Sequence, residues 1–187
     1  MASGIVQKKA EALRKIAGEI GRCRICKTNK IGLPVPGEGN PDADVVFIGE
    51  APGKQEAKAG RPFIGRAGKV LRGLIAKAGL KEEKVFITSP VKYLPKYVTP
   101  TLGDIKHGRK HLSAQFRVIE PKIVVLLGRV AALAVLEQNF LIARDHGKIV
   151  KKDGITYLIT YHPAAPLYSP KVGVELERDF KKLKRLI

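Results

Sequence analysis

The sequence predicts an α/β/α sandwich, in which helices cover both faces of a central, mainly parallel four-stranded sheet. Short apolar runs bounded by turn residues alternate along the chain with segments of helical periodicity. Strands that alternate with helices in this way form parallel sheets that are buried on both faces. The length of 187 residues suits one domain, which we expect to span residues 1–187.

The elements follow one another in a regular order. A first helix is expected over residues 5–21, where Ile5, Leu13 and Ile20 belong to one apolar stripe. A loop rich in Gly and Pro then covers residues 32–42. The predicted strands are 43–49, 85–89, 122–128 and a hairpin of 148–150 with 155–160, which turns at Asp153-Gly154. The remaining predicted helices are 67–78, 104–119, 130–137 and 172–186.

The charge balance points to a polyanionic partner. Lys and Arg number 35 against 17 Asp and Glu, which gives a net charge of +18. A positive field of this size attracts nucleic acid, with an anionic membrane surface or a merely solvated Lys-rich face as the alternatives. The sequence contains neither a membrane-length apolar run nor a secretory signal peptide. We therefore expect a cytoplasmic, monomeric protein. Asn, Gln and Met are scarce, a composition that resembles that of proteins from archaeal hyperthermophiles.

Candidate site residues follow the predicted strands. Ligands of such sheets bind beyond the carboxyl ends of the strands. Glu50 follows one strand and His162 follows another, so a carboxylate and an imidazole are expected to share one cleft, the minimum set for acid–base or electrostatic catalysis. An isolated loop histidine would carry no such implication. The turn 49–54 has three residues between its glycines and Gln55 after its Lys, so it is not a Walker A loop, and we exclude nucleoside triphosphate hydrolysis.

Four motifs carry a resemblance to a known family. They are Gly-Glu-Ala-Pro-Gly at 49–53, Gly-Arg-Pro-Phe-Ile-Gly-Arg-Ala-Gly at 60–68, Leu-Leu-Gly at 126–128 and His-Pro-Ala-Ala at 162–165. In this order they resemble the family 4 uracil-DNA glycosylases of thermophiles and archaea, from about residue 22 to residue 170. The resemblance implies a monofunctional glycosylase of base excision repair. Such an enzyme flips a damaged base, uracil first, out of DNA and hydrolyses its N-glycosidic bond.

The same resemblance implies a role for each site residue. Phe63 would stack on the flipped base, while Glu50 and the amides around Ala51 would hold the attacking water. His162 would donate a hydrogen bond to the base carbonyl that gains negative charge. We expect His162 to be neutral, because it need only polarise and a surrounding cationic field disfavours a further positive charge. The segment 163–169 would wedge the minor groove through Ala164, Ala165 and the intercalating Leu167. The candidate phosphate contacts flank the first motif and the helix behind it, with a solvated face as the alternative for each: Lys54, Arg61, Arg66, Lys69 and Arg72.

The cysteine content departs from that family, which usually holds a four-cysteine iron–sulfur cluster. Cys23 and Cys26 match the first pair, whereas Tyr93 and about Gly108 stand at the other two positions. Two cysteines cannot build a four-thiolate site, so we expect no cofactor. The alternatives are a zinc site that adds His107 and His111, whose i, i+4 helical spacing permits it, and a free thiol pair or local disulfide. Without a cluster, the loop 25–35 would be held by apolar packing of Tyr93, Leu94, Tyr97 and Val98.

The base-reading position also departs from the family. Ser89 stands where the family commonly has Asn, and a hydroxyl reaches less far and offers fewer hydrogen bonds than an amide. The first alternative function is therefore a glycosylase whose selection is relaxed toward hypoxanthine or hydroxyuracil. The second, from another class, is a damaged-DNA-binding protein without catalysis. Retention of Glu50, Phe63 and His162 favours an enzyme, because a binder needs no such combination.

Overall fold

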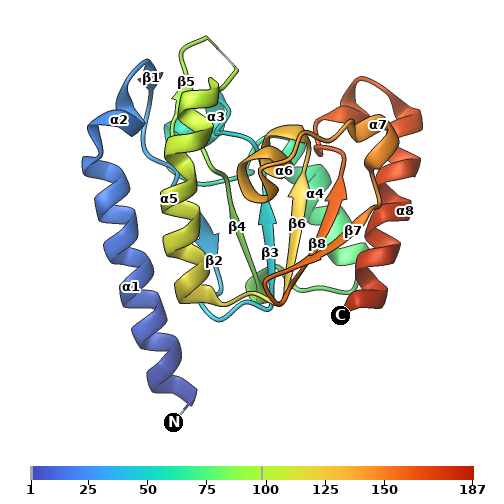
Figure 1. Cartoon of the computed structure of the whole chain (residues 1–187), viewed down its shortest axis with the longest axis horizontal. Coiled ribbons are helices and arrows are strands. Elements are labelled where there is room, and N and C mark those ends of the chain that lie inside the picture. The colour runs from blue at the N-terminus through green and yellow to red at the C-terminus, as the bar shows by residue number, and fades with distance from the viewer. Residues whose placement is uncertain (1, 98) are drawn as a thin grey trace.

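The computed structural model describes residues 2–97 and 99–187 and has a mixed six-stranded sheet at its centre (Figure 1). The strand order is β2-β4-β3-β6-β8-β7. The four inner strands run parallel to one another, as expected: β4 (Val85–Thr88), β3 (Val45–Ile48), β6 (Ile123–Leu127) and β8 (Ile155–Thr160).

The four-stranded sheet of the sequence prediction is therefore extended by one antiparallel strand at each edge. β2 (Glu38–Gly39) lies in the segment predicted as loop, and two residues are too few to show an alternating pattern. β7 (Ile149–Lys152) is the first arm of the predicted hairpin, and it pairs with β8 along its whole length. Its mostly exposed, Lys-containing face suits an edge strand.

Helices cover both faces of the sheet, so the α/β/α sandwich is confirmed. On one face, α5 (Leu102–Ile119), α6 (Arg129–Leu136) and α1 (Ala2–Arg22) pack over Val46 and Ile48 of β3. On the other, α4 (Arg66–Lys77) and α8 (Pro170–Leu186) pack over Val45 and Phe47 of the same strand. Successive residues of a strand point to opposite faces, which is why one apolar run supplies both cores. No described helix has the length and apolar character that crossing a membrane requires.

The carboxyl ends of the four parallel strands meet at one edge of the sheet, at the top of Figure 1. Shorter elements gather there: α2 (Arg24–Lys27), α3 (Lys54–Ala59), α7 (Ile142–Asp145), the 3₁₀ turn η2 (Ala165–Leu167), and a small ribbon of β1 (Lys30–Ile31) with β5 (Leu94–Pro95). At the opposite edge, the 3₁₀ turn η1 (Glu82–Lys84) leads into β4.

The predicted apolar packing around the loop 25–35 holds only in part. Tyr93 is 3% exposed and packs against Ile16, Ile20 and Cys26, and Leu94 pairs with Ile31 in the ribbon. Tyr97, in contrast, is 75% exposed, so its predicted packing role is wrong. Its side chain lies beside Lys96, whose ammonium is 5.9 Å from the Tyr97 ring centroid. Val98, the fourth residue of that prediction, lies outside the described residues.

Candidate active site

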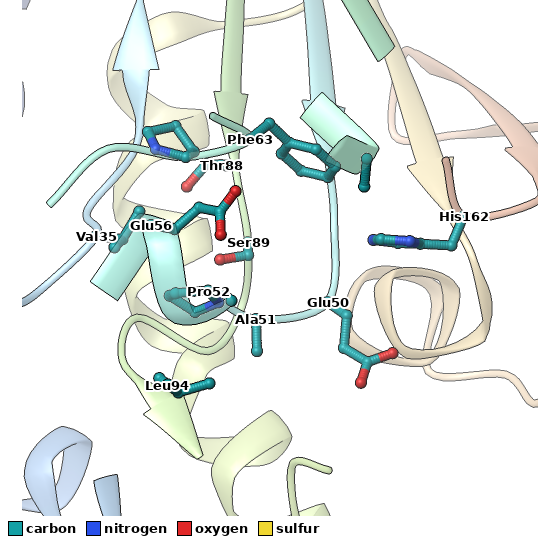
Figure 2. Close-up of a pocket in the computed structure, with 13 residues that line it drawn as sticks. Val35, Glu50, Ala51, Pro52, Glu56, Phe63, Thr88, Ser89, Leu94 and His162 are labelled. Atoms are coloured by element: carbon teal, nitrogen blue, oxygen red, sulfur yellow. The ribbon is translucent and has the colours of Figure 1, made fainter. Parts of the chain in front are cut away.

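A pocket of about 320 Å³ opens at the carboxyl edge of the sheet (Figure 2). This volume lies at the lower end of the range of small-molecule sites. The turn after β3, the segment 62–67, the end of β4 and the turn after β8 all contribute to it. The lining residues are Val35, Glu50, Ala51, Pro52, Gly53, Glu56, Pro62, Phe63, Ala67, Thr88, Ser89, Leu94 and His162. The structure thus brings together Glu50, Ala51, Phe63, Ser89 and His162, the residues predicted for catalysis and base binding.

The Phe63 ring forms one wall of this pocket. Its ring lies 5.7 Å from that of His162, centroid to centroid, with 30° between the two planes. It also rests on the backbone of Gly49, where an added Cβ would come 2.6 Å from Cε2 of the ring. Phe63 adopts the left-handed backbone region, with φ of 51°, which is rare for a bulky side chain. Such a conformation persists only where surrounding contacts hold it.

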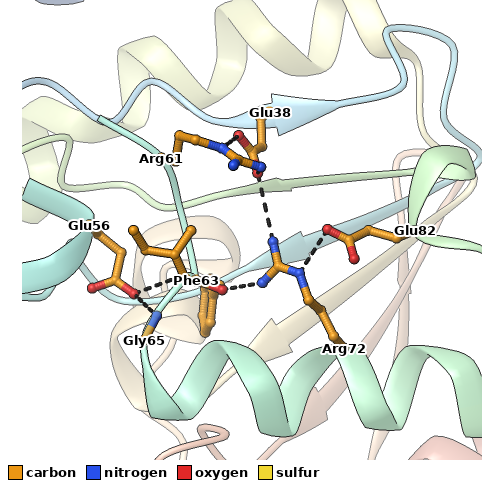
Figure 3. Close-up of polar contacts among 8 residues, drawn as sticks. Glu38, Glu56, Arg61, Phe63, Gly65, Arg72 and Glu82 are labelled. Carbon is orange, nitrogen blue, oxygen red and sulfur yellow. Dashed lines mark hydrogen bonds and ion pairs between the residues drawn. The ribbon is translucent and has the colours of Figure 1, made fainter. Parts of the chain in front are cut away.

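Two charged residues supply those contacts: Glu56, which sequence reasoning missed, and Arg72, which it expected to contact DNA (Figure 3). One carboxylate oxygen of Glu56 accepts hydrogen bonds from the amides of Ile64 and Gly65, both at 2.9 Å. Arg72 donates to the carbonyl oxygen of Phe63 and pairs with Glu82 at 2.8 Å. The backbone from Phe63 to Gly65 is therefore tied to α3 through Glu56 and to α4 through Arg72, which holds the ring in place.

His162 presents one ring nitrogen as an acceptor to the backbone. The amide of Ala164 donates to Nδ1 of His162 at 3.2 Å, which places the proton of a neutral ring on Nε2. Burial lowers the pKa of His162 to about 4, against a weaker opposing effect of Glu56. Burial therefore favours the predicted neutral state, and it acts here in place of the expected cationic field. Gly128, with φ of 92°, allows the close approach, because a Cβ there would lie 3.2 Å from Cβ of His162.

Glu50 lies at the mouth of the pocket, on the turn between β3 and α3 (Figure 2). Partial burial raises the pKa of its carboxyl above the ordinary value, and the charge of Arg129 acts in the opposite direction. A carboxylate that water solvates incompletely interacts more strongly with a nearby positive charge. Glu50 and His162 therefore offer one anionic group and one neutral donor to the same ligand.

The floor of the pocket contains the predicted base-binding residue Ser89 and borders a buried polar network that sequence reasoning missed. Ser89 is 5% exposed, and its hydroxyl donates to the carbonyl of Val91 at 2.8 Å, so its oxygen remains as an acceptor. Behind it, the ammonium of Lys92 lies 2.7 Å from Oγ1 of Thr88 and 3.0 Å from Oε1 of Gln115. Burial lowers the pKa of Lys92 to about 7. A lysine next to an apolar segment gives no sequence signal of burial, because most lysines are exposed.

The residues predicted to contact DNA lie around the pocket and outside its lining. Lys54, Arg66 and Lys69 are exposed in the first turns of α3 and α4. Arg61 is exposed too, and its guanidinium pairs with the carboxylate of Glu38 at 2.8 and 3.0 Å (Figure 3). Arg72 points toward the Phe63 loop rather than away from the protein.

The predicted wedge segment follows His162 directly. Ala164 and Ala165 are half-buried, and the exposed fractions of the next apolar side chains are 40% for Leu167 and 82% for Tyr168. Two exposed apolar side chains on a short 3₁₀ turn beside the pocket are the kind of feature that inserts into a base stack. Contacts of these residues with DNA stay a prediction.

A second cluster of functional side chains lies outside the pocket. Sγ of Cys23 is 3.2 Å from Nε2 of His107, and Sγ of Cys26 is 3.2 Å from Nε2 of His111. All four donor atoms lie within 4.8 Å of one another, a grouping that can hold a metal ion. Without a cation, burial raises the pKa of the Cys26 thiol to about 12, with a smaller contribution from Cys23.

The fold and the pocket define an α/β/α protein with a ligand-sized site at the carboxyl ends of its parallel strands. The sequence profile of the uracil DNA glycosylase superfamily matches residues 36–185. The type-4 uracil-DNA glycosylase of Sulfurisphaera tokodaii is 41% identical in an alignment that covers 94% of this chain and 85% of the relative. The type-4 enzyme of Archaeoglobus fulgidus is 40% identical, with 94% of each chain covered. That of Saccharolobus solfataricus is 39% identical, with 92% of this chain and 85% of the relative covered.

The chain therefore belongs to the uracil-DNA glycosylase superfamily. These relatives are its type-4 members, so the family resemblance that the four sequence motifs carry is confirmed.

Proposed function

We propose that this chain is a DNA glycosylase that flips uracil out of DNA and hydrolyses its N-glycosidic bond. The observation that carries the proposal is the convergence of Phe63, His162 and Glu50 on one pocket at the carboxyl edge of the sheet. The names of the type-4 relatives support uracil as the base.

In this mechanism, water adds to C1′ of the deoxyribose as the bond from C1′ to the base nitrogen breaks, and the proton that the water loses finally neutralises the departing base. The bonding electron pair leaves with the base, so negative charge grows on the base oxygens and positive charge on the sugar. Nε2–H of the neutral His162 donates to the base oxygen, and the Glu50 carboxylate stabilises the sugar and holds the water. Preorganised groups of this kind supply the largest share of many rate enhancements.

Phe63 has the role of a stacking platform for the flipped base. The ties to Glu56 and Arg72 support this role, because a ring that is already fixed loses little conformational freedom when the base arrives. Lys54, Arg66 and Lys69 would contact phosphates, and Leu167 would fill the space that the flipped base leaves. Arg61 would also contact a phosphate, provided that the DNA displaces Glu38 from its guanidinium.

Several broader properties stay predictions. We propose a single-domain monomer that acts in the cytoplasm on DNA, and whose catalysis uses no iron–sulfur cluster. The net charge of +18 supports the DNA partner. Size-exclusion chromatography with light scattering tests the monomer, whose expected mass is 20.4 kDa.

A panel of labelled oligonucleotides tests the function. Each duplex carries one uracil, hypoxanthine or hydroxyuracil, and alkali converts an abasic site into a strand break that a gel detects. We expect cleavage at uracil under single-turnover conditions. If the chain cuts a duplex with another lesion and leaves the uracil duplex uncut, that lesion replaces uracil as the proposed substrate. If it binds these duplexes tightly and forms no abasic product, the chain is a DNA-binding protein without catalysis.

A further inference from the structure

The four side chains of the Cys/His cluster come from two segments that lie far apart in sequence. Cys23 caps the N-terminus of α2 and Cys26 lies within that helix, while His107 and His111 are one turn apart on α5. Because residues i and i+4 lie on the same face of a helix, both imidazoles reach toward α2. The Cys26 and His111 side chains are buried, at 9% and 5% exposure, which limits the access of water to the donor atoms.

The Cys/His cluster lacks the donors and the space for the four-cysteine iron–sulfur cluster that the family resemblance implies. At the third position, the Tyr93 ring fills the space against Ile16 and Ile20. At the fourth, Gly108 lies directly against Pro90, and a Cβ there would be 2.2 Å from the Pro90 carbonyl oxygen. In an iron–sulfur cluster of four irons, the four cysteine sulfurs lie outside the core of iron and sulfide, which keeps them far apart. Four donor atoms within 4.8 Å of one another enclose far less space.

One tetrahedral ion fits instead. Bonds of about 2.0–2.1 Å to nitrogen and about 2.3 Å to sulfur place tetrahedral ligand atoms roughly 3.3–3.8 Å apart. The two sulfur–nitrogen contacts of 3.2 Å lie close to these values. The limit of 4.8 Å on the remaining pairs leaves about 1 Å for the side chains to close around an ion. The spacing of two residues between the cysteines and three between the histidines is also that of structural zinc sites.

We propose that Cys23, Cys26, His107 and His111 bind one Zn²⁺ ion as a structural site. Two sulfur and two nitrogen donors in a tetrahedron select zinc among the common divalent metals. Binding releases one proton from each thiol, so the two thiolates balance the charge of the ion and two protons leave for each Zn²⁺. The zinc site, which the sequence offered as an alternative to no cofactor, is the one that the geometry favours.

The ion would connect the end of α1 and the loop after α2 to α5. This loop leads through the β1–β5 ribbon to Val35 and Leu94, both of which line the pocket. The metal would thus hold one wall of the pocket while taking no part in the reaction. This role does not depend on which base the enzyme removes.

The test is the metal content of tag-free protein, together with its optical spectrum. We expect one zinc and no stoichiometric iron or acid-labile sulfide per chain, in aerobic and anaerobic preparations alike. After removal of zinc under reducing conditions, Co²⁺ should bind one to one with the intense visible bands of a tetrahedral site and a sulfur-to-cobalt charge-transfer band. Stoichiometric iron with sulfide would overturn the proposal, as would a chain that takes up neither Zn²⁺ nor Co²⁺ with both thiols reduced.

Variants assign the ligands. His111→Ala should weaken Co²⁺ binding by at least tenfold and shift its absorption bands. Lys106→Ala, an exposed change on the same helix next to His107, should leave both unchanged. If His111→Ala does not fold, Cys23→Ser, at the more accessible ligand, provides the same spectral test, because loss of one thiolate must reduce the charge-transfer band. Bands identical to those of the unmodified chain in these variants would place the metal elsewhere.

Discussion

Gly49→Ala tests whether the position of the Phe63 ring controls catalysis. The new methyl group would lie 2.6 Å from Cε2 and 2.7 Å from Cζ of the ring. Carbon atoms pack at about 3.5–4.0 Å, so the ring must move by roughly 1 Å. A displacement of that size costs about 10²-fold in rate. Overpacking costs about 1–3 kcal/mol of stability, which lowers Tm by roughly 2–12 °C in a domain of this size.

Gly73→Ala is the matched control, since it makes the same chemical change at an exposed position within α4. A Cβ at Gly73 has no neighbour within 4 Å. We expect a gain of about 0.5–1 kcal/mol from helix propensity and an unchanged rate. The assay is single-turnover excision of uracil from a labelled duplex, with thermal denaturation of both variants. A rate for Gly49→Ala within threefold of the unmodified chain would refute the reasoning.

Three further predictions follow from the site and the charge. Phe63→Ala should weaken binding to uracil-containing DNA by about 1–3 kcal/mol more than binding to undamaged DNA; equal losses in fluorescence anisotropy would make Phe63 a core residue only. Binding to undamaged duplex should weaken with salt at a slope of about −0.9 per phosphate contacted, and a flat dependence would contradict the partner. The active forms are the neutral His162, whose pKa is about 4, and the ionised Glu50, whose pKa is raised. Because acid protonates both groups, the excision rate should fall only on the acid side of its pH profile. The profile should show no inflection from His162 near the ordinary histidine pKa of 6.5. An inflection there that persists in Glu50→Gln would contradict this assignment.

Periodicity predicted most of the fold because the inner strands and the long helices have strong patterns. The strand predicted at 122–128, for example, is β6, Ile123–Leu127, a wholly buried apolar run. Of the two edge strands, β7 was predicted as an arm of the hairpin, whereas β2 was predicted as loop. β2 is only two residues long, and its pairing depends on Gly39 at φ of 131° against the backbone of β4. Such pairing is set by tertiary contact and leaves no local pattern.

The pocket-lining site residues were predictable because motifs at strand ends converge at one edge of a parallel sheet. The supporting residues were not predictable, because their roles depend on side-chain direction. Arg72 was expected to face phosphate, yet it turns inward to the Phe63 carbonyl. Lys92 gave no signal at all, although it is buried beneath the pocket. The same limit applied to His107 and His111, whose spacing permitted a metal site that only the distance to the cysteines makes specific.

The most direct test of the account compares the unmodified chain with His162→Ala in single-turnover excision of uracil. Binding to the same duplex is measured in parallel, because His162 is expected to act on the departing base and not on affinity. We predict that the unmodified chain releases free uracil and that His162→Ala excises it slower by orders of magnitude, with DNA binding nearly intact. An unchanged excision rate in His162→Ala would remove this residue from the mechanism. Failure of the unmodified chain to release uracil would contradict the account as a whole.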